Sequence, residues 1–411
     1  MHATLPCDIL GINAGKTHPE KPKVRNRGWI FLQKATTAEL KRTNTKNVLE
    51  FIYGRRKTSK LEIASGLGLS RPTVSQIVRE LMDQGVIAQK GSFESTGGRK
   101  AEALAFLPRS HVAVGVELLK ESFEIVAIDL YGEIIHTEMQ LLPFSNTSGY
   151  VRAVCGAVNR FIGRLPVDPS RVLGVNIVLQ GLISSDGETV TYGKILNCTG
   201  MSIEQFKPYL NYPCGMAHDG EAAATVELWL SPDIVNAIFV HIRYNMSGAL
   251  IIGGKFLKGN ELKSGVFEHM TIVPGGRPCY CGKQGCVDTY CTLSALLMPD
   301  EPVARFFAAL RAGGTDEVAR WDEYLKYLAS AIDNLHMMMD YDVILGGILG
   351  RYLAAEDIDR LHQLVAARTA FPTDRRFIRI GATAKIPIAA GAALPHVMQY
   401  LGIQSRGQGV S

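Results

Sequence analysis

The chain has 411 residues, of which 46% are hydrophobic and 20% are charged, a composition ordinary for a globular protein with two or three domains. The sequence has no apolar run near the ~20 residues that span a bilayer and no signal-peptide pattern at its start, which excludes membrane insertion and export. We therefore expect a cytoplasmic protein, in which the eight cysteines serve as metal ligands or core residues and not as disulfides.

Positive charge is concentrated at the N-terminal end of the chain, whose net charge is +5. Residues 1–36 hold six Lys and Arg against two Asp and Glu, residues 37–106 hold twelve against seven, and the remainder holds 26 against 30. This distribution favours a polyanion as the partner of the N-terminal region, with a solvated basic face as the alternative. Residues 1–36 lack periodicity and are rich in Lys, Arg, Pro and Gly, which predicts a flexible basic leader.

Residues 37–106 have the pattern of a winged helix-turn-helix domain. In TNTKNVLEFIYGRR (43–56), one helical stripe contains Val48, Leu49, Phe51 and Ile52. A short second helix follows around Leu61, Ile63 and Ala64, then a turn that begins at Gly66. Ser70 is placed to cap a third helix, whose inward residues are Val74, Ile77, Val78 and Leu81. Two strand patterns then enclose TGGRK (96–100), which predicts a cationic wing tip.

In a helix-turn-helix, the N-terminal turn of the second helix of the motif enters the major groove of DNA. Arg71 suits guanine and Gln76 suits adenine, while the wing tip suits the DNA backbone or the minor groove. We therefore predict binding of a double-stranded DNA operator through Ser70, Arg71, Thr73, Ser75, Gln76, Arg79, Arg99 and Lys100. The alternative is a small helical subdomain with a surface hairpin.

One histidine and three cysteines stand close together in HMTIVPGGRPCYCGKQGC (269–286). Three thiolates and one imidazole are a usual set for structural zinc, and they leave no coordination position for an activated water. The spacing predicts a structural Zn²⁺ ion bound by His269, Cys279, Cys281 and Cys286. The alternative is a glycine-rich loop with buried free cysteines.

After Pro108 the pattern becomes α/β. Strand patterns lie at 111–139, 172–183 and 236–257, and helical patterns lie at 147–163, 221–230, 301–312 and 317–340. Because strands and helices recur in two similar halves, we expect two α/β lobes around a cleft.

Several short motifs resemble the ROK family of repressors, open reading frames and kinases. They are the spacing of the metal ligands with CGKQGC at 281–286, LSRPTVSQIVRELMDQGVI at 69–87, HDGEAAA at 218–224, VILGG at 343–347 and AAGAA at 389–393. The resemblance is to the family's winged-helix regulators of the N-acetylglucosamine and xylose repressor type. It implies an actin-like, ribonuclease H-like α/β body with a sugar cleft. Lobe 1 would span 110–232 and be completed by about 386–403, and lobe 2 would span 233–385 with the zinc site.

In both phosphate loops of the family's kinases, this chain has bulkier residues where the kinases have glycines, such as Leu119 and Lys120 in the first loop and Met246 in the second. Residues 117–121 (ELLKE) stand where the kinases resemble Asp-x-Gly-Gly-Thr, and residues 244–249 (YNMSGA) stand where they resemble Gly-Thr-Gly-x-Gly-Gly. Glycines allow backbone N–H groups to approach phosphates, and the carboxylate of Glu121 would repel them. We therefore expect no ATP-dependent kinase activity and no enzyme.

The resemblance implies a sugar or sugar-derivative effector bound by Asn197, His218, Asp219, His269 and Asp288. Asp219 matches the catalytic base of the kinases and would accept a hydrogen bond from a sugar hydroxyl. His218 stands where the family usually has Asn, and Asp288 where it has Glu. In GVFEH (265–269), Val266 replaces a sugar-binding Glu and Glu268 replaces a Gly. These changes favour a deoxy, acetylated or otherwise modified sugar, or a sugar site that has lost its function.

Together these patterns predict a transcriptional regulator, a repressor of carbohydrate genes. Ligand binding between the lobes would change their closure and the spacing of two winged helices. We expect a homodimer or higher oligomer, because two winged helices read a palindromic operator. Two alternatives remain: a ROK sugar kinase with a DNA-binding appendage, and a regulator controlled by docking of a protein partner.

Overall fold

The computed structural model describes residues 36–92 and 102–402. The predicted leader, apart from Thr36, and the predicted wing tip lie outside the described residues. The chain divides into two compact units, 1–44 and 45–411, so that the first helix begins in one unit and continues in the other. The predicted domain boundaries differ from this division and stay predictions.

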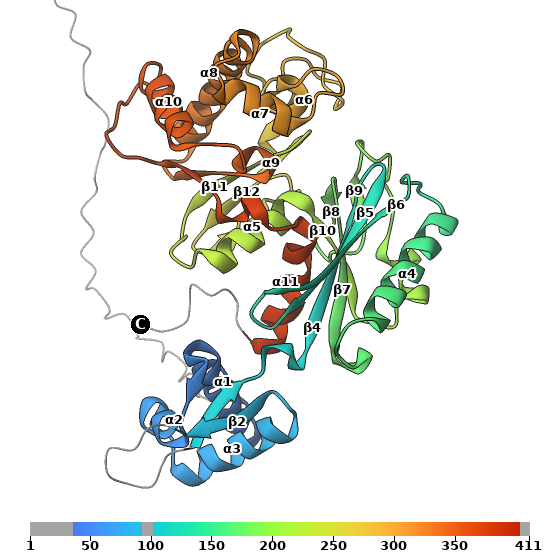
Figure 1. Cartoon of the computed structure of the whole chain (residues 1–411), viewed down its shortest axis with the longest axis vertical. Coiled ribbons are helices and arrows are strands. Elements are labelled where there is room, and N and C mark those ends of the chain that lie inside the picture. Colours follow the sequence, from blue (N-terminus) through green and yellow to red (C-terminus); the bar gives the residue numbers. More distant parts are fainter. Residues whose placement is uncertain (1–35, 93–101, 403–411) are drawn as a thin grey trace, which may run out of the picture. The chain divides into compact units, whose positions relative to one another are not determined.

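The N-terminal region contains three helices and three strands, in the order helix, strand, helix, helix, strand, strand (Figure 1). They are α1 (Thr37–Arg55), β1 (Lys57–Thr58), α2 (Lys60–Leu67), α3 (Arg71–Asp83), β2 (Ile87–Ser92) and β3 (Glu102–Phe106). The strands form an antiparallel sheet in the order β1-β3-β2. This arrangement confirms the predicted winged helix-turn-helix, with β1 as an additional short strand.

Local capping explains where α2 and α3 begin. Ser59 accepts a hydrogen bond from the backbone N–H of Glu62 at 3.2 Å, and the Glu62 carboxylate accepts one from the backbone of Ser59 at 2.9 Å. Gly68, at φ +63°, ends α2 in the left-handed conformation that favours glycine. Ser70 then caps α3 by accepting from the backbone N–H of Thr73 at 3.3 Å, as predicted. The four residues predicted to face inward from α3 are all buried: Val74, Ile77, Val78 and Leu81.

The body begins with a five-stranded sheet and its helices. Its elements are η1 (Pro108–Ser110), β4 (Val112–Leu118), β5 (Ser122–Asp129), β6 (Ile134–Leu141), α4 (Ser148–Gly163), η2 (Pro169–Arg171), β7 (Val172–Leu179), β8 (Leu182–Ile183), β9 (Val190–Tyr192), η3 (Ile203–Gln205), η4 (Lys207–Tyr209), β10 (Cys214–His218) and α5 (Asp219–Leu230). The sheet order is β10-β7-β4-β5-β6, and β8 pairs with β9 in a separate hairpin.

A second five-stranded sheet follows in the chain. Its elements are β11 (Ala237–Ile242), β12 (Met246–Ile252), β13 (Lys255–Phe256), η5 (Phe267–His269), η6 (Val287–Thr289), α6 (Leu293–Leu296), α7 (Val303–Arg311), α8 (Thr315–Met338), β14 (Asp342–Gly346), α9 (Gly347–Gly350), α10 (Ala355–Ala366), β15 (Ile378–Ile380), η7 (Ala382–Lys385) and α11 (Ile388–Leu401). The sheet order is β13-β12-β11-β14-β15.

The two large sheets have the same topology. In each, three antiparallel strands that follow one another in the chain (β4-β5-β6 and β11-β12-β13) are extended by two parallel strands beside the first of them. This repetition confirms the predicted two-lobed, actin-like α/β body. The cores of the two lobes are separate clusters of buried apolar side chains, one around β4, β7 and α4, the other around β11, β14 and α8.

Helix α11 returns from the second sheet and packs against β4, β5 and β7 of the first, as Figure 1 shows in red. Its AAGAA segment allows a close backbone approach on two sides. A Cβ atom on Gly115 of β4 would lie 1.7 Å from the Ala389 carbonyl oxygen, and one on Gly391 would lie 1.9 Å from the Ala222 carbonyl oxygen of α5. Glycine is therefore required at both positions for α11 to lie between the first sheet and α5.

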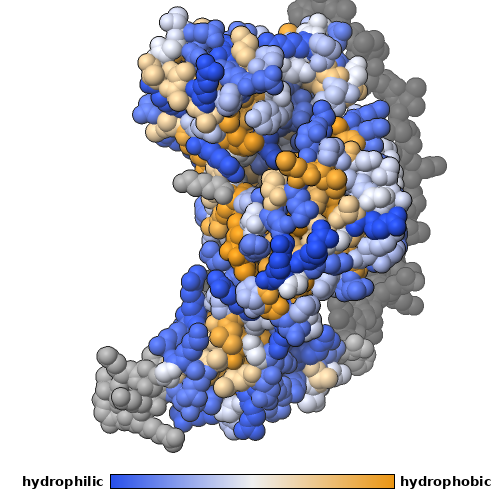
Figure 2. Space-filling model, turned by 45° about the vertical axis from the view of Figure 1, so that its right-hand side comes forward, coloured by the Kyte–Doolittle hydropathy of each residue, from blue (hydrophilic) through white to orange (hydrophobic). Residues whose placement is uncertain are grey.

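The visible surface carries both hydrophobic and hydrophilic residues (Figure 2). In Figure 2, hydrophobic residues gather in the middle of the visible face, with hydrophilic residues above and below them. None of the described helices combines the length and hydropathy that crossing a bilayer requires.

Candidate functional site

The predicted DNA-binding residues of α3 form a polar face opposite its buried stripe. Ser70, Arg71, Gln76 and Arg79 are exposed, and Thr73 and Ser75 are half-buried. The amide of Gln76 donates a hydrogen bond to the Glu80 carboxylate at 3.1 Å, and the hydroxyls of Ser70 and Thr73 lie 2.8 Å apart. The helix thus presents two exposed guanidinium groups and one amide to solvent. The other two predicted residues, Arg99 and Lys100, lie outside the described residues.

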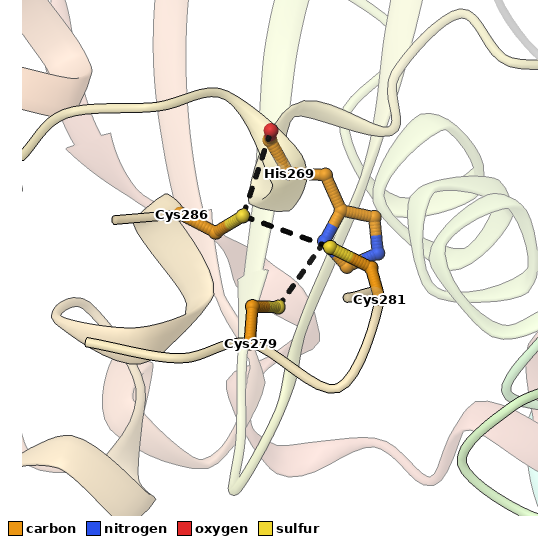
Figure 3. Close-up of side chains that lie close together, drawn as sticks. All are labelled: His269, Cys279, Cys281 and Cys286. Carbon is orange, nitrogen blue, oxygen red and sulfur yellow. Dashed lines mark hydrogen bonds between the residues drawn. The ribbon is translucent and has the colours of Figure 1, made fainter. Parts of the chain in front are cut away.

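The structure brings the four predicted metal ligands together (Figure 3). His269 ends η5, and the cysteines lie on the loop that leads to η6. Nδ1 of His269 lies 3.6 Å from Sγ of Cys279, the sulfurs of Cys281 and Cys286 lie 3.7 Å apart, and all four ligand atoms lie within 4.8 Å of one another. Burial lowers the pKa of His269, which favours the neutral imidazole that binds metals. The cluster could hold a metal ion.

The loop around the cluster depends on glycine. Gly282 and Gly285 have φ values of +95° and +77°, and a Cβ atom on Gly285 would lie 1.7 Å from the Val273 carbonyl oxygen. These turns bring Cys286 back beside the strand-like residue Thr271, with which it forms an isolated β-bridge. The CGKQGC motif therefore fixes the loop as well as supplying two sulfurs.

A cavity of about 830 Å³ lies between the β8–β9 region of the first lobe and the β12–η5 region of the second. Its lining residues are Gln180, Gly181, Leu182, Ser184, Ser185, Thr191, Tyr192, Lys194, Ile195, His218, Asp219, Met246, Ser247, Asn260, Glu261, Leu262, Lys263, Val266, Glu268, His269 and Tyr280. Three of the five predicted effector residues are among them: His218, Asp219 and His269. Because His269 directs Nδ1 to the cluster, the cavity and the metal site share one side chain.

The floor of the cavity carries two buried carboxyl groups, one from each lobe. Asp219, at the start of α5, is 2% exposed, and its Oδ2 accepts a hydrogen bond from the Ser247 hydroxyl at 3.1 Å. Nε2 of His218 lies 3.2 Å from Asp219 Oδ1, near enough for an ion pair but without the alignment of a hydrogen bond. Glu268, in η5, is 5% exposed. Burial raises the pKa of Glu268 well above its usual value, and the carboxylates of Asp219 and Asp288 add to this effect.

The structure does not bring the other two predicted effector residues, Asn197 and Asp288, into the lining of this cavity. Asn197 is exposed, with a φ of +50°, on the loop after β9. Asp288 is buried behind the floor, where its carboxylate accepts a hydrogen bond from the backbone N–H of Met246 at 2.9 Å. Sequence reasoning in turn did not select the wall residues Leu182 and Tyr192, which lie in the short strands β8 and β9, or Ile195, Leu262 and Tyr280, which lie outside helices and strands.

The residues that match the kinase phosphate loops carry a buried ion pair between the lobes. Glu117, at the end of β4, pairs with Arg243, directly after β11. The side chain of Glu117 is 4% exposed and that of Arg243 is 18% exposed. Burial raises the pKa of the Glu117 carboxyl, and the Arg243 guanidinium opposes that rise. Met246, in the second loop, is also buried. Met246 therefore places a side chain where the kinases have glycine, whereas Glu117 stands at the Asp of their first loop and Arg243 lies directly before the second.

Sequence comparison with known proteins identifies two matching families. Residues 113–372 match the ROK family, and residues 41–88 match the family described as winged helix-turn-helix DNA-binding. The chain is 25% identical over 260 residues to the DNA-binding transcriptional dual regulator NagC of Escherichia coli K12, and 26% identical over 261 residues to the xylose repressor of Bacillus subtilis 168. The matches cover 62% and 63% of this chain, and 64% and 68% of those two proteins.

Solved structures support the fold. A crystal structure of a ROK family transcriptional regulator, a homologue of the E. coli MLC protein, matches with a TM-score of 0.65 at 20% identity and covers 88% of this chain and 99% of its own. A ROK family glucokinase from Streptomyces griseus, in complex with glucose and AMPPNP, matches with a TM-score of 0.60 at 21% identity. That match covers 69% of this chain and 98% of the glucokinase chain.

Proposed function

The chain belongs to the ROK family, and we propose that it is a DNA-binding transcriptional regulator, a repressor of carbohydrate genes with a sugar-type effector. The observation that carries this proposal is the combination of the two parts. A capped helix with an exposed polar face stands in the same chain as a two-lobed body that encloses a cavity. The similarity to NagC and to the xylose repressor supports the same function.

DNA recognition is proposed through α3. Arg71 and Gln76 are exposed near its N-terminus, where a recognition helix meets the major groove. Arg79 lies two turns further along the same helix. We propose that the chain acts as a homodimer or higher oligomer, because two copies of α3 would read the two halves of a palindromic operator.

The experiment that tests this function is capture of fragmented genomic DNA on the purified full-length protein, followed by sequencing. We expect enrichment of a palindromic site near carbohydrate genes. On that site, Arg71→Ala and Gln76→Ala should each weaken binding by about 1–3 kcal/mol, measured by fluorescence anisotropy. Lys326→Ala, an exposed cation of α8, is the matched control and should leave binding unchanged. Capture without enrichment of any sequence would refute the proposal.

We propose zinc as the metal of the His269 cluster. With zinc–sulfur bonds of about 2.3 Å and zinc–nitrogen bonds of about 2.0–2.1 Å, tetrahedral angles separate two sulfurs by about 3.8 Å and sulfur from nitrogen by about 3.6 Å. The separations of Cys281 from Cys286 and of His269 from Cys279 are 3.7 and 3.6 Å, and all four ligand atoms lie within 4.8 Å of one another. Since four protein ligands complete a tetrahedron, the ion would be structural, holding His269 and the loop beside the cavity.

We propose that the body does not phosphorylate its ligand. In the first phosphate loop, Leu119 and Lys120 stand where the kinases have glycines, and the carboxylate of Glu121 opposes binding of polyphosphate. Incubation with ATP, Mg²⁺ and a panel of hexoses should give no ADP in a coupled assay. Measurable turnover would establish the alternative, a sugar kinase with a DNA-binding appendage.

We also propose that the protein is cytoplasmic, because an operator and sugar metabolites meet there.

A further inference from the structure

Two carboxyl oxygens at the floor of the cavity lack a hydrogen-bond partner among the described residues, although His218 Nε2 lies 3.2 Å from one of them, Asp219 Oδ1. The other is Glu268 Oε2, and both oxygens are buried. A buried polar atom left unsatisfied is unfavourable, so a ligand that brings donors to both oxygens gains from each. The two oxygens belong to residues of opposite lobes that both line the cavity.

In the part of the chain that the structure describes, the floor of the cavity offers no lysine or arginine to an anion. Asp219 and Glu268 line the cavity, whereas the lysines of its described lining, Lys194 and Lys263, are exposed, and Lys263 pairs with Glu261. A phosphate or carboxylate on the part of the ligand that reaches the floor would therefore find no such cation beside it among these described residues. Sugar hydroxyls, which donate without charge, fit the floor.

Apolar side chains from both lobes form part of the walls above the floor, beside polar residues such as Gln180, Thr191 and Asn260. Leu182, Tyr192 and Ile195 lie on the first lobe's side, and Leu262, Val266 and Tyr280 lie on the second. Val266 stands two residues before Glu268, where a carboxylate would have made this wall polar. Apolar and aromatic walls around a few polar groups are the usual lining of a site for an organic ligand with an apolar part.

The cavity is also larger than one sugar ring requires. Its volume of about 830 Å³ would hold on the order of 28 water molecules at about 30 Å³ each, whereas a hexose has only about twelve non-hydrogen atoms. Sites of 300–1,000 Å³ commonly bury ligands of about twice a hexose's size or more. The space between the apolar walls is therefore left for a second group.

We propose that the cleft binds an uncharged glycoside with an apolar aglycone, whose sugar hydroxyls reach Asp219 and Glu268 and whose aglycone lies between the apolar walls. This inference rests on the proposed function, since it takes the effector to be a carbohydrate. It adds that the free sugar and the sugar phosphate are the weaker ligands. Val266 is then a specificity-determining residue for the aglycone, and Glu268 for the sugar.

The test is isothermal titration of the full-length protein with D-glucose, D-xylose, D-galactose and N-acetyl-D-glucosamine. Each free sugar is compared with its phenyl β-glycoside in one pair and with its phosphate ester in a second pair. For at least one sugar, the phenyl glycoside should bind on the order of ten- to a hundred-fold more tightly than the free sugar, the gain expected from burying one phenyl group. The phosphate ester should bind more weakly than the free sugar. Equal affinities throughout each pair, tighter binding of a phosphate ester, or no binding of any probe would overturn the proposal.

Two variants test which residues cause the preference for the phenyl glycoside over the free sugar. Val266→Glu should lower the affinity for the phenyl glycoside at least ten-fold while changing that for the free sugar less, and Val235→Glu, the same change at an exposed position outside the cavity lining, should do neither. Glu268→Ala should weaken both members of the pair. Retention of DNA binding shows that each variant is folded. An unchanged preference in Val266→Glu would refute the aglycone site while leaving the regulator intact, whereas failure of DNA capture would refute the regulator whatever the probes do.

Discussion

The buried ion pair between Glu117 and Arg243 gives a prediction whose size and pH dependence follow from the structure. Removal of one partner from a buried pair leaves the other charge uncompensated, which costs about 3–5 kcal/mol. The Arg243 side chain is 18% exposed, so we expect the lower end of that range, about 3 kcal/mol, for Glu117→Gln. With a shift of about 2–4 °C per kcal/mol for domains of 150–250 residues, the melting temperature should fall by about 6–12 °C.

The partner variant, Arg243→Met, should depend on pH in a definite direction. Burial already raises the folded-state pKa of Glu117, and loss of the guanidinium removes the group that opposes that rise. The folded variant then binds a proton that the unfolded chain has released, so its stability is highest below the unfolded pKa and is lost as pH rises through the folded pKa. Melting curves from scanning calorimetry should therefore show a larger loss at pH 8 than at pH 5. The double variant, with neither charge, should lose less than the sum of the two single losses.

The matched control is the exposed pair of Glu204 and Lys207. Because exposed pairs contribute little, Glu204→Gln should lower the free energy of unfolding by less than about 1 kcal/mol at any pH. Additive losses in the double variant, or a loss in Arg243→Met that is the same at pH 5 and pH 8, would mean that the two charges do not act as a buried pair.

Two further perturbations test the metal cluster and the packing of α11. Cys281→Ser should reduce bound zinc, measured by inductively coupled plasma mass spectrometry, from about one ion per chain to a small fraction and should lower the melting temperature, because structural metal binding is coupled to folding. Cys214→Ser, a free cysteine outside the cluster, should retain the metal, and equal zinc in both variants would remove the assignment. Gly391→Ala should cost about 1–3 kcal/mol in thermal unfolding, because its Cβ would lie 1.9 Å from a carbonyl oxygen of α5. Gly163→Ala, at the end of α4 with no atom within 4 Å of the new Cβ, should be neutral or slightly stabilising, and equal losses would contradict the packing argument.

The winged helix-turn-helix and the metal cluster could be predicted because their determinants are local. Ser70 caps α3 through its own neighbour three residues on, and the buried stripe of α3 follows helical spacing within one segment. The metal ligands likewise lie within 18 residues, and glycines at required turns direct three of them toward the fourth. For α3 and for the metal cluster, one short stretch of sequence therefore contains the residues that determine the local structure.

Other elements were missed for two different physical reasons. Strands β10 and β15 are five and three residues long, too short for a period to emerge, and they form only because a neighbouring parallel strand pairs with them. Helix α10 is different, since Ile358, Leu361 and Val365 have helical spacing and are buried. That signal was present in the sequence and was not used.

The residues that line the cavity could not be predicted from their positions in the sequence alone, because the direction of a side chain depends on contacts with residues far away in the sequence. Asp288 and Glu268 are both acidic residues beside metal ligands, and position in the family pattern favoured Asp288 as the ligand-binding group. In the structure, Asp288 turns to the backbone N–H of Met246, 42 residues away, and that hydrogen bond holds it behind the floor. Glu268 replaces a glycine, and its Oε2 has no hydrogen-bond partner among the described residues, although the residue lines the cavity. The substitution thus adds a second buried carboxyl group to the lining, beside that of Asp219.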